Sequence, residues 1–270
     1  MSHHHLARED APFGDDVWEH IDKAAIETAR GQLSARRMLH VEGPYGLGLK
    51  ALGGPDELVH EEDEMAAAVS AACLVPLASI RKGFTIPMRD IAAHERGGVP
   101  FGAPQVAHTA IACARREDQI LFNGSDALGV AGLLNMDGSA SVELGEWAEP
   151  GAAMEDLIKA ATALDDASFH GPYALGLSPE RYNLLFRRYR QGNMVEIEHV
   201  RNLVTDGVVK VPALDSGGVM VASGRQFATI VLGQDLSVGF IGPADGNYEF
   251  DLSETVALRV AHPGCICVLR

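Results

Sequence analysis

The segment Gly46-Leu47-Gly48-Leu49-Lys50-Ala51-Leu52-Gly53-Gly54-Pro55 decides how this chain folds. Closely spaced glycines and a proline disfavour a helix, so the segment is expected to be extended. Apolar residues alternate through it and continue downstream, namely Leu47, Leu49, Leu52, Leu58 and Val59. We therefore interpret residues 46–80 as a long arm or hairpin whose apolar side chains require a partner surface.

A helix is predicted on the N-terminal side of the arm, from Asp16 to about Leu33. Asp16 and Glu19 have the spacing of a capping box, which satisfies free amides at the start of a helix. Val17 and Ile21 begin a run of apolar residues at helical spacing. One face of this helix is therefore expected to be buried.

Downstream of the arm, the sequence predicts a strand at 80–88 and helices at 104–122, 152–167 and 178–189. Glu117 and Asp118 are assigned to the polar outer face of the first of these helices, 104–122. After residue 208 apolar residues alternate with polar ones, and the predicted strands are 208–212, 218–223, 227–232, 236–241, 247–252, 255–261 and 265–269. Helices and strands do not alternate as βα units, so the predicted fold class is α+β.

Composition narrows the classes of partner. The 270 residues include 22 Lys and Arg against 37 Asp and Glu, a net charge of −15. Nucleic acids and anionic membrane surfaces require a basic protein face, so neither is expected as a partner. The N-terminus lacks the apolar core of a secretory signal, and a cytoplasmic location is predicted. The four cysteines lack metal-ligand spacing and are interpreted as small, buried apolar residues.

No motif predicts catalysis. The run Gly46–Ala51 fits G-x-G-x-x-A, but the glycines and proline that follow would end the helix that dinucleotide binding requires. Acidic and histidine-containing runs at 60–63 and 94–95 lack regular metal spacing and are interpreted as solvated. We therefore expect no enzyme activity, no metal and no cofactor. A soluble enzyme with dispersed catalytic residues is the less favoured alternative.

Six short runs, in this order and spacing, resemble the encapsulin shell proteins (family 1, the linocin or bacteriocin-like family). They are Trp18–Asp22, Val41–Gly46, Gly129–Leu134, Gly171–Leu175, Leu232–Gly239 and Glu254–Pro263. The resemblance extends from about residue 11 to the C-terminus. It implies an HK97-like capsid fold with a peripheral domain, an axial domain and an extended E-loop. A phage-type major capsid protein of the same fold is the alternative.

This resemblance divides the chain as follows. Residues 1–45 are assigned to the N-terminal helix and the start of the peripheral domain, and residues 46–80 to the E-loop arm. Residues 81–137 are assigned to the peripheral domain with its spine helix, and residues 138–223 to the axial domain. Residues 224–270 are assigned to the return strands of the peripheral domain. Family members form icosahedral shells, which implies a homo-oligomer of sixty copies or a multiple. The arm leucines and valine named above would serve assembly.

The resemblance also implies a cargo. Shells of this family enclose an enzyme, such as a peroxidase or a ferritin-like protein, through its C-terminal targeting peptide. The positions that match the binding groove are Thr28, Arg36, Leu39, His40, Asp235, Leu236 and Val238. The family often has an acidic residue where this chain has His40. The positions that match the loop at the five-fold pore are Arg190, Gln191, Gly192, Asn193 and Met194. Some members bind flavin through an aromatic residue in the segment matching 87–91, where this chain has none, so no flavin is expected.

Overall fold

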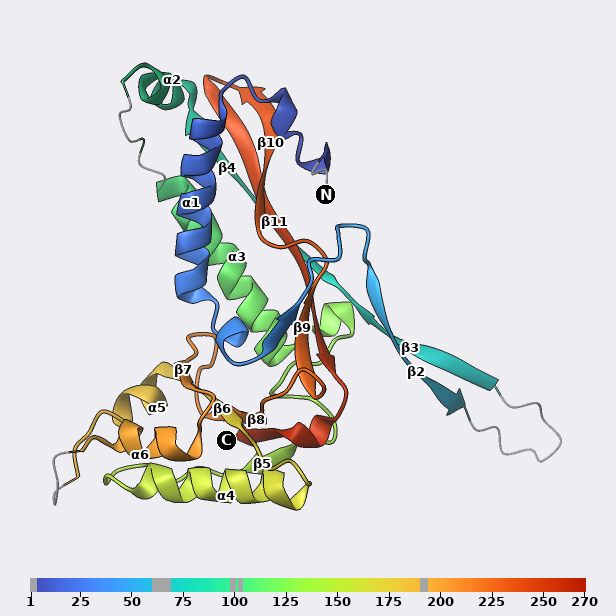
Figure 1. Cartoon of the computed structure of the whole chain (residues 1–270), viewed down its shortest axis with the longest axis vertical. Coiled ribbons are helices and arrows are strands. Elements are labelled where there is room, and N and C mark those ends of the chain that lie inside the picture. Colours follow the sequence, from blue (N-terminus) through green and yellow to red (C-terminus); the bar gives the residue numbers. More distant parts are fainter. Residues whose placement is uncertain (1–3, 60–68, 98–100, 102–103, 190–193) are drawn as a thin grey trace.

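The structure, a computed structural model, describes residues 4–59, 69–97, 101, 104–189 and 194–270. It has an elongated upper unit, a lower unit set across its end, and a hairpin that projects to one side (Figure 1). Helices and strands form separate layers in both units, so the predicted α+β class is confirmed. Among the described residues, no helix combines the length and apolar character needed to cross a bilayer.

The upper unit is built on one long strand, β11 (Asn247–Val260). On one side β11 pairs with β10 (Ser237–Ala244) and then with β9 (Ala228–Leu232), which in turn pairs in parallel with β1 (His40–Glu42). On its other side it pairs with β4 (Ala78–Pro87). The sequence predicted two strands where β11 is continuous, because the polar pair Ser253-Glu254 reads as a break. Inside the structure the Glu254 side chain accepts a hydrogen bond from Arg36 at 2.9 Å, so the strand continues through it.

Two long helices cover this sheet. The helix α1 (Asp15–Gln32) packs against α3 (Pro104–Asn123), and α3 packs on β4 and β11. The predicted capping box is wrong: α1 begins one residue early with Gly14 as its N-cap, and no side chain caps it. The short helix α2 (Met88–Gly97) was not predicted, because Ile91 is its one buried residue and gives no apolar periodicity.

The lower unit contains a second five-stranded sheet. Its strand order is β5 (Ala140–Val142), β12 (Ile266–Leu269), β8 (Gly218–Ala222), β6 (Tyr173–Leu177) and β7 (Val208–Lys210). The helices of this unit are α4 (Ala152–Asp166), α5 (Pro179–Leu184) and α6 (Glu196–Leu203), the last of which was not predicted.

The last strand corrects the predicted division of the chain. Residues 224–270 were expected to return to the peripheral sheet, yet β12 lies between β5 and β8 in the lower unit. All four of its residues are buried, as expected for a central strand covered on both faces. The arm also ends earlier than residue 80, because Ala78 and Ser79 already pair with β11.

Asp156 organises the core of the lower unit around Trp147. One oxygen of this carboxylate, Oδ2, accepts hydrogen bonds from Trp147 Nε1 at 2.9 Å and from the Gly145 amide at 2.8 Å. Its other oxygen accepts from Lys159 Nζ at 2.8 Å. Burial works to raise the pKa of Asp156, but the hydrogen bonds from Lys159, Gly145 and Trp147 outweigh it and lower that pKa. The ionised carboxylate is therefore the form that the fold favours.

Replacing Asp156 by alanine is expected to destabilise the lower unit by about 1–3 kcal/mol for each buried donor left without an acceptor. Because the pKa of Asp156 is lowered in the fold, its contribution is present above the unfolded pKa and is lost as pH falls through the folded one. Thermal unfolding followed by tryptophan fluorescence at neutral and acidic pH measures both effects. Asp166→Ala, at an exposed position at the end of the same helix, is the control. An equal penalty for both variants would contradict the assignment.

Candidate functional site

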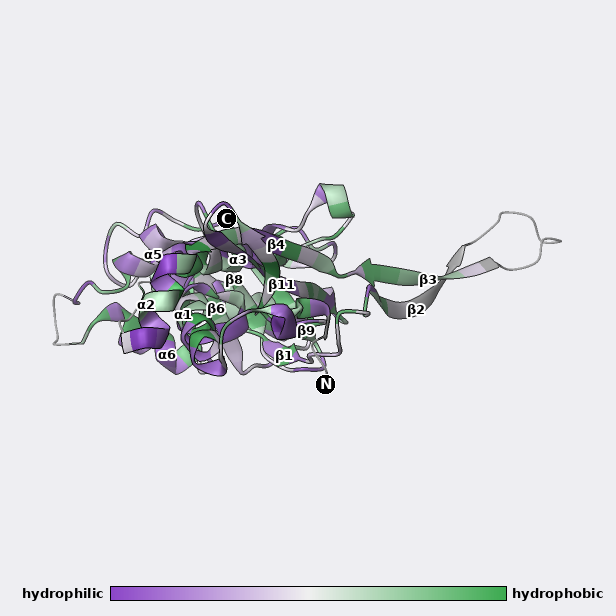
Figure 2. Ribbon diagram, turned by 90° about the horizontal axis from the view of Figure 1, so that it is seen from above, coloured by the Kyte–Doolittle hydropathy of each residue, from purple (hydrophilic) through white to green (hydrophobic). Residues whose placement is uncertain are grey.

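The projecting hairpin consists of β2 (Ala51–Val59) and β3 (Val69–Pro76). Its register runs from Ala51 opposite Pro76 to Val59 opposite Val69. Within the described chain these two strands pair only with each other, and they extend sideways from the body (Figure 2). An isolated two-stranded hairpin is marginally stable in water. The arm predicted from its glycines therefore exists as an extended hairpin that lacks a covering surface in the single subunit.

The apolar side chains of the arm are open to solvent. The side chains of Leu47 and Leu74 are 44% and 64% exposed, and Leu49 and Leu52 are half-buried. Leu58 and Val59 lie in β2, but their side chains fall outside the described part of the chain. The sequence did not identify Leu74 as an exposed residue of the arm. It follows a run of small residues, in which apolar and polar side chains do not alternate.

The base of the arm is fixed where two of the recognised runs meet. The amide of Tyr45 donates to Leu232 O at 3.0 Å, and the amide of Gly46 donates to Gly233 O at 2.6 Å. Gly43 has φ of +113°, and a Cβ there would lie 2.4 Å from Leu232 O. Such a distance excludes any side chain. The G-P-Y-G and L-G-Q-D runs are thus two halves of one contact between the arm and the sheet.

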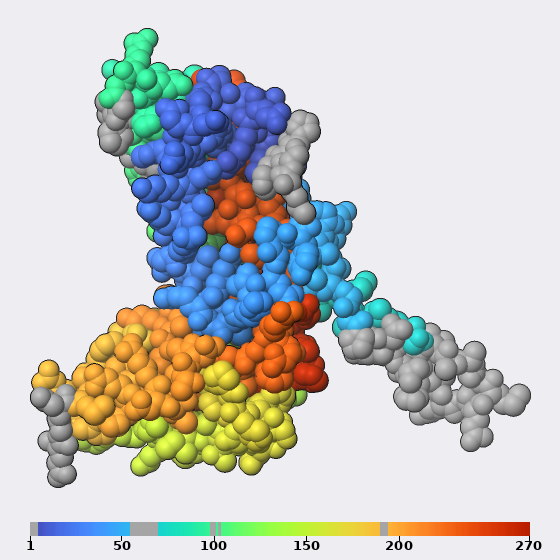
Figure 3. Space-filling model, in the orientation of Figure 1, coloured from blue at the N-terminus to red at the C-terminus, as the bar shows by residue number. Residues whose placement is uncertain are grey.

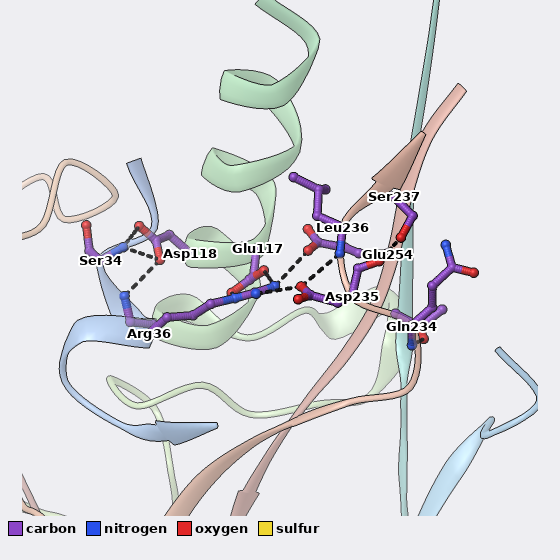
Figure 4. A network of polar contacts seen from close by, with 11 residues as sticks. Ser34, Arg36, Glu117, Asp118, Gln234, Asp235, Leu236, Ser237 and Glu254 are labelled. Carbon is purple, nitrogen blue, oxygen red and sulfur yellow. Dashed lines mark hydrogen bonds and ion pairs between the residues drawn. The ribbon is translucent and has the colours of Figure 1, made fainter. Parts of the chain in front are cut away.

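Beside this contact, the Arg36 side chain joins four segments of the upper unit (Figure 4). Arg36 lies in a short 3-10 helix, η3 (Ala35–Arg37), that follows α1. Its Nε and Nη2 donate to the two oxygens of Glu117 on α3 at 2.8 and 2.7 Å. Nη2 also reaches Glu254 of β11 at 2.9 Å, and Nη1 reaches Asp235 before β10 at 2.7 Å. One guanidinium therefore faces three carboxyl groups.

Two of these three carboxyl groups are buried. The side chains of Glu117 and Glu254 are 0% and 1% exposed, and Glu254 Oε1 has no hydrogen-bond partner. Burial raises the pKa of Glu254 well above its usual value; Glu117 raises it further, while Arg36 opposes the shift. Burial also acts to lower the pKa of Arg36, but Glu117, Asp235 and Glu254 raise it above its usual value. The arrangement keeps Arg36 charged and favours a proton on Glu254.

Asp118 holds the backbone that carries Arg36. Its carboxylate accepts from the Ser34 amide at 2.9 Å and from the Ala35 amide at 3.0 Å. These are free amides at the start of η3, where an acceptor is stabilising. The predicted outer-face position of Glu117 and Asp118 is therefore wrong, because both are buried under the segment 34–36. Glu117 lies seven residues after Ala110 and four before Leu121, so its position on the apolar stripe could have indicated this.

The predicted groove residues are only partly brought together. Arg36, Leu39 and His40 line a cavity of about 470 Å³ between η3–β1 and the lower unit. Asp235 joins them through its ion pair with Arg36. Leu236 is half-buried beside Asp235 and packs against the core, and Val238 is buried within the subunit. Thr28 is half-buried on α1. Arg37, Ser223 and Arg225, which also line the cavity, were not identified from the sequence.

Two other expectations concern loops and thiols. Residues 190–193 of the predicted pore loop lie outside the described residues, and Met194 is 44% exposed.

All four cysteines are free; Cys113, Cys265 and Cys267 are buried, whereas Cys73 on β3 is exposed. Burial raises the pKa of the Cys265 and Cys267 thiols to about 11 each. These two thiols are therefore uncharged at neutral pH.

Comparison with known proteins gives consistent matches over nearly the whole chain. Residues 3–257 match the family described as "Encapsulating protein for peroxidase". The type 1 encapsulin shell protein EncA of Myxococcus xanthus is 31% identical, over 98% of this chain and 96% of that protein. A virus-like particle from Pyrococcus furiosus has a TM-score of 0.74 at 20% identity, covering 94% of this chain and 99% of that one. The capsid protein of Myoviridae phage XM1 has a TM-score of 0.61 at 12% identity, covering 86% and 88%.

The pKa of Glu254, which burial raises, gives a pH test. Because the pKa of Glu254 is raised in the fold, its contribution to stability is present at low pH and is lost as pH rises through the folded pKa. Glu254→Gln removes this loss, so the variant should gain stability relative to the parent as pH rises, by up to about 1.4 kcal/mol per pH unit.

Chemical denaturation across pH 5 to 8 measures the difference, with the exposed Glu27→Gln on α1 as the control. A constant difference between the Glu254 variant and the parent over this range would show that Glu254 is ionised in the fold.

Proposed function

The chain belongs to the encapsulin family of shell proteins, and from this premise we propose that sixty copies or a multiple close into one particle through the projecting arm. The family and the HK97-like capsid fold expected from the sequence are confirmed. The protein forms the wall of an icosahedral nanocompartment. The phage-capsid alternative shares the fold, but the family match favours the encapsulin shell.

One observation carries the role of the arm: a hairpin whose two strands pair only with each other in the described chain projects from the body and holds Leu74, the most exposed of the large apolar side chains described, at 64%. Free strand edges and apolar side chains are both satisfied by the surface of another copy. Each contact is repeated around a closed particle, so interfaces of modest affinity together give a durable shell. The arm is therefore proposed as the principal assembly element.

The wall is also proposed to bind cargo at the groove around Arg36, Leu39 and His40. The supporting observations are the cavity that these residues line and the half-buried Leu236 at its neighbouring turn. The occupant would be the C-terminal targeting peptide of an enclosed enzyme, such as a peroxidase or a ferritin-like protein. In this proposal Arg36 holds the polar frame of the groove, since its partners come from α3, β11 and the turn before β10.

The arm proposal is tested by Leu74→Asp. A charge on this exposed position should prevent closed particles, because burying it at a contact between copies is costly, while the subunit itself stays folded. Leu74→Met, which keeps an apolar side chain of similar size, should assemble normally. Electron microscopy and light scattering measure particle formation. Normal particles from the Asp variant would contradict the role of this strand.

The cargo proposal is tested by Leu236→Asp. Particles should still form, because Leu236 lies on the turn before β10 and not on the projecting strands β2 and β3, but their content of native cargo should fall at least tenfold. Leu236→Met is the conservative control. Mass spectrometry of particles purified from the source organism gives cargo per shell. Undiminished cargo in well-formed particles of the Asp variant would remove this turn from the binding groove.

A further inference from the structure

The cavity beside Arg36 is lined by positively charged side chains whose role the assembly and cargo proposals do not explain. It lies where the segment 36–40 abuts Pro172, Asp206 and the segment 223–225 of the lower unit. Figure 3 shows the end of the blue N-terminal region directly against the orange atoms of that unit. At about 470 Å³ it falls within the usual range of ligand sites.

The cavity is cationic in a strongly acidic protein. The Arg36 guanidinium is already engaged by three carboxyl groups. Arg37 donates its Nε to Leu33 O, and its terminal nitrogens have no carboxylate within ion-pairing distance in the described chain. Arg225 also has no such ion pair among these residues. Asp206 is the one acidic residue among the described residues that line the cavity. Because Arg37 and Arg225 also line it, the lining has an excess of positive charge.

Ser223 adds a hydrogen-bonding group without a partner. Its amide already donates to Pro172 O at 2.7 Å, whereas its buried Oγ has no hydrogen-bond partner. Buried hydroxyls are ordinarily hydrogen-bonded, but this oxygen is inaccessible to water, so it does not face the open cavity. The donors on the lining are therefore the guanidinium groups of Arg37 and Arg225, which suit an anion.

We propose that this cavity binds a carboxylate of the cargo segment, with Arg37 and Arg225 as the charged donors. The inference rests on the proposed cargo function, because the cavity shares Arg36, Leu39 and His40 with the groove. A planar guanidinium fork matches the geometry of a carboxylate. Met38, Leu39 and Pro172 supply apolar lining, which fits a peptide better than a free inorganic anion.

Purified particles are titrated with dye-labelled peptides of one sequence, Gly-Leu-Gly-Leu followed by Glu amide, Gln amide or Gln with a free terminal carboxylate. Fluorescence anisotropy reports binding. The Glu amide and the free-acid peptide should each bind about tenfold to a hundredfold more tightly than the Gln amide, the range expected from charged hydrogen bonds. The tighter of the two identifies a side-chain or a terminal carboxylate as the source.

This preference should fall at least tenfold in Arg225→Ala and in Arg37→Ala, and persist in Arg201→Ala, an exposed arginine on α6 away from the cavity. Equal binding of acid and amide peptides, or an unchanged preference in Arg225→Ala, would overturn the proposal. Inorganic phosphate that competes more strongly than either acidic peptide would overturn the peptide assignment. Loss of cargo in Leu236→Asp is measured separately, so a failure of the groove is distinguished from a failure of the anion site.

Discussion

A hairpin that cannot bury its own apolar side chains is the constraint on which the rest of the molecule depends. The strands β2 and β3 have no third strand beside them in the described chain, and Leu74 stands open to solvent at 64% exposure. The single subunit leaves this apolar side chain exposed, and under the proposed assembly another copy covers it. The body is accordingly built to hold the base of the arm in place, through the contact of Tyr45 and Gly46 with residues 232–233.

The same region concentrates buried charge. Two buried glutamates and an exposed aspartate share one arginine, which is costly unless geometry and hydrogen bonds are good. The gain is positional, since Arg36 ties η3 to α3, to β11 and to the turn that carries Leu236. Asp118 fixes the backbone at the start of η3 by accepting hydrogen bonds from the amides of Ser34 and Ala35. The cluster therefore fixes the positions of these segments relative to one another, including the turn at which the cargo groove is proposed.

The sequence predicted the arm, the long helices and most strands, because glycine spacing and apolar periodicity are local signals. It missed α2 and α6, whose buried residues are too few to show a period. It placed Glu117 and Asp118 on the surface, because their burial depends on Arg36 and on amides more than eighty residues away in the chain. Arg37, Ser223 and Arg225 share a cavity only through tertiary contact between the two units, which no spacing in the sequence records.

The position of β12 sets an order of events during synthesis. Its neighbours β5 and β8 leave the ribosome earlier, and the gap between them stays unfilled until residues 266–269 emerge. Closure of a loop from residue 142 to residue 266 is a slow, long-range step. A nascent chain therefore exposes its completed arm while its second sheet is still unfinished. The lower sheet is thus completed only after residues 266–269 have been synthesised, when β12 can pair with both β5 and β8.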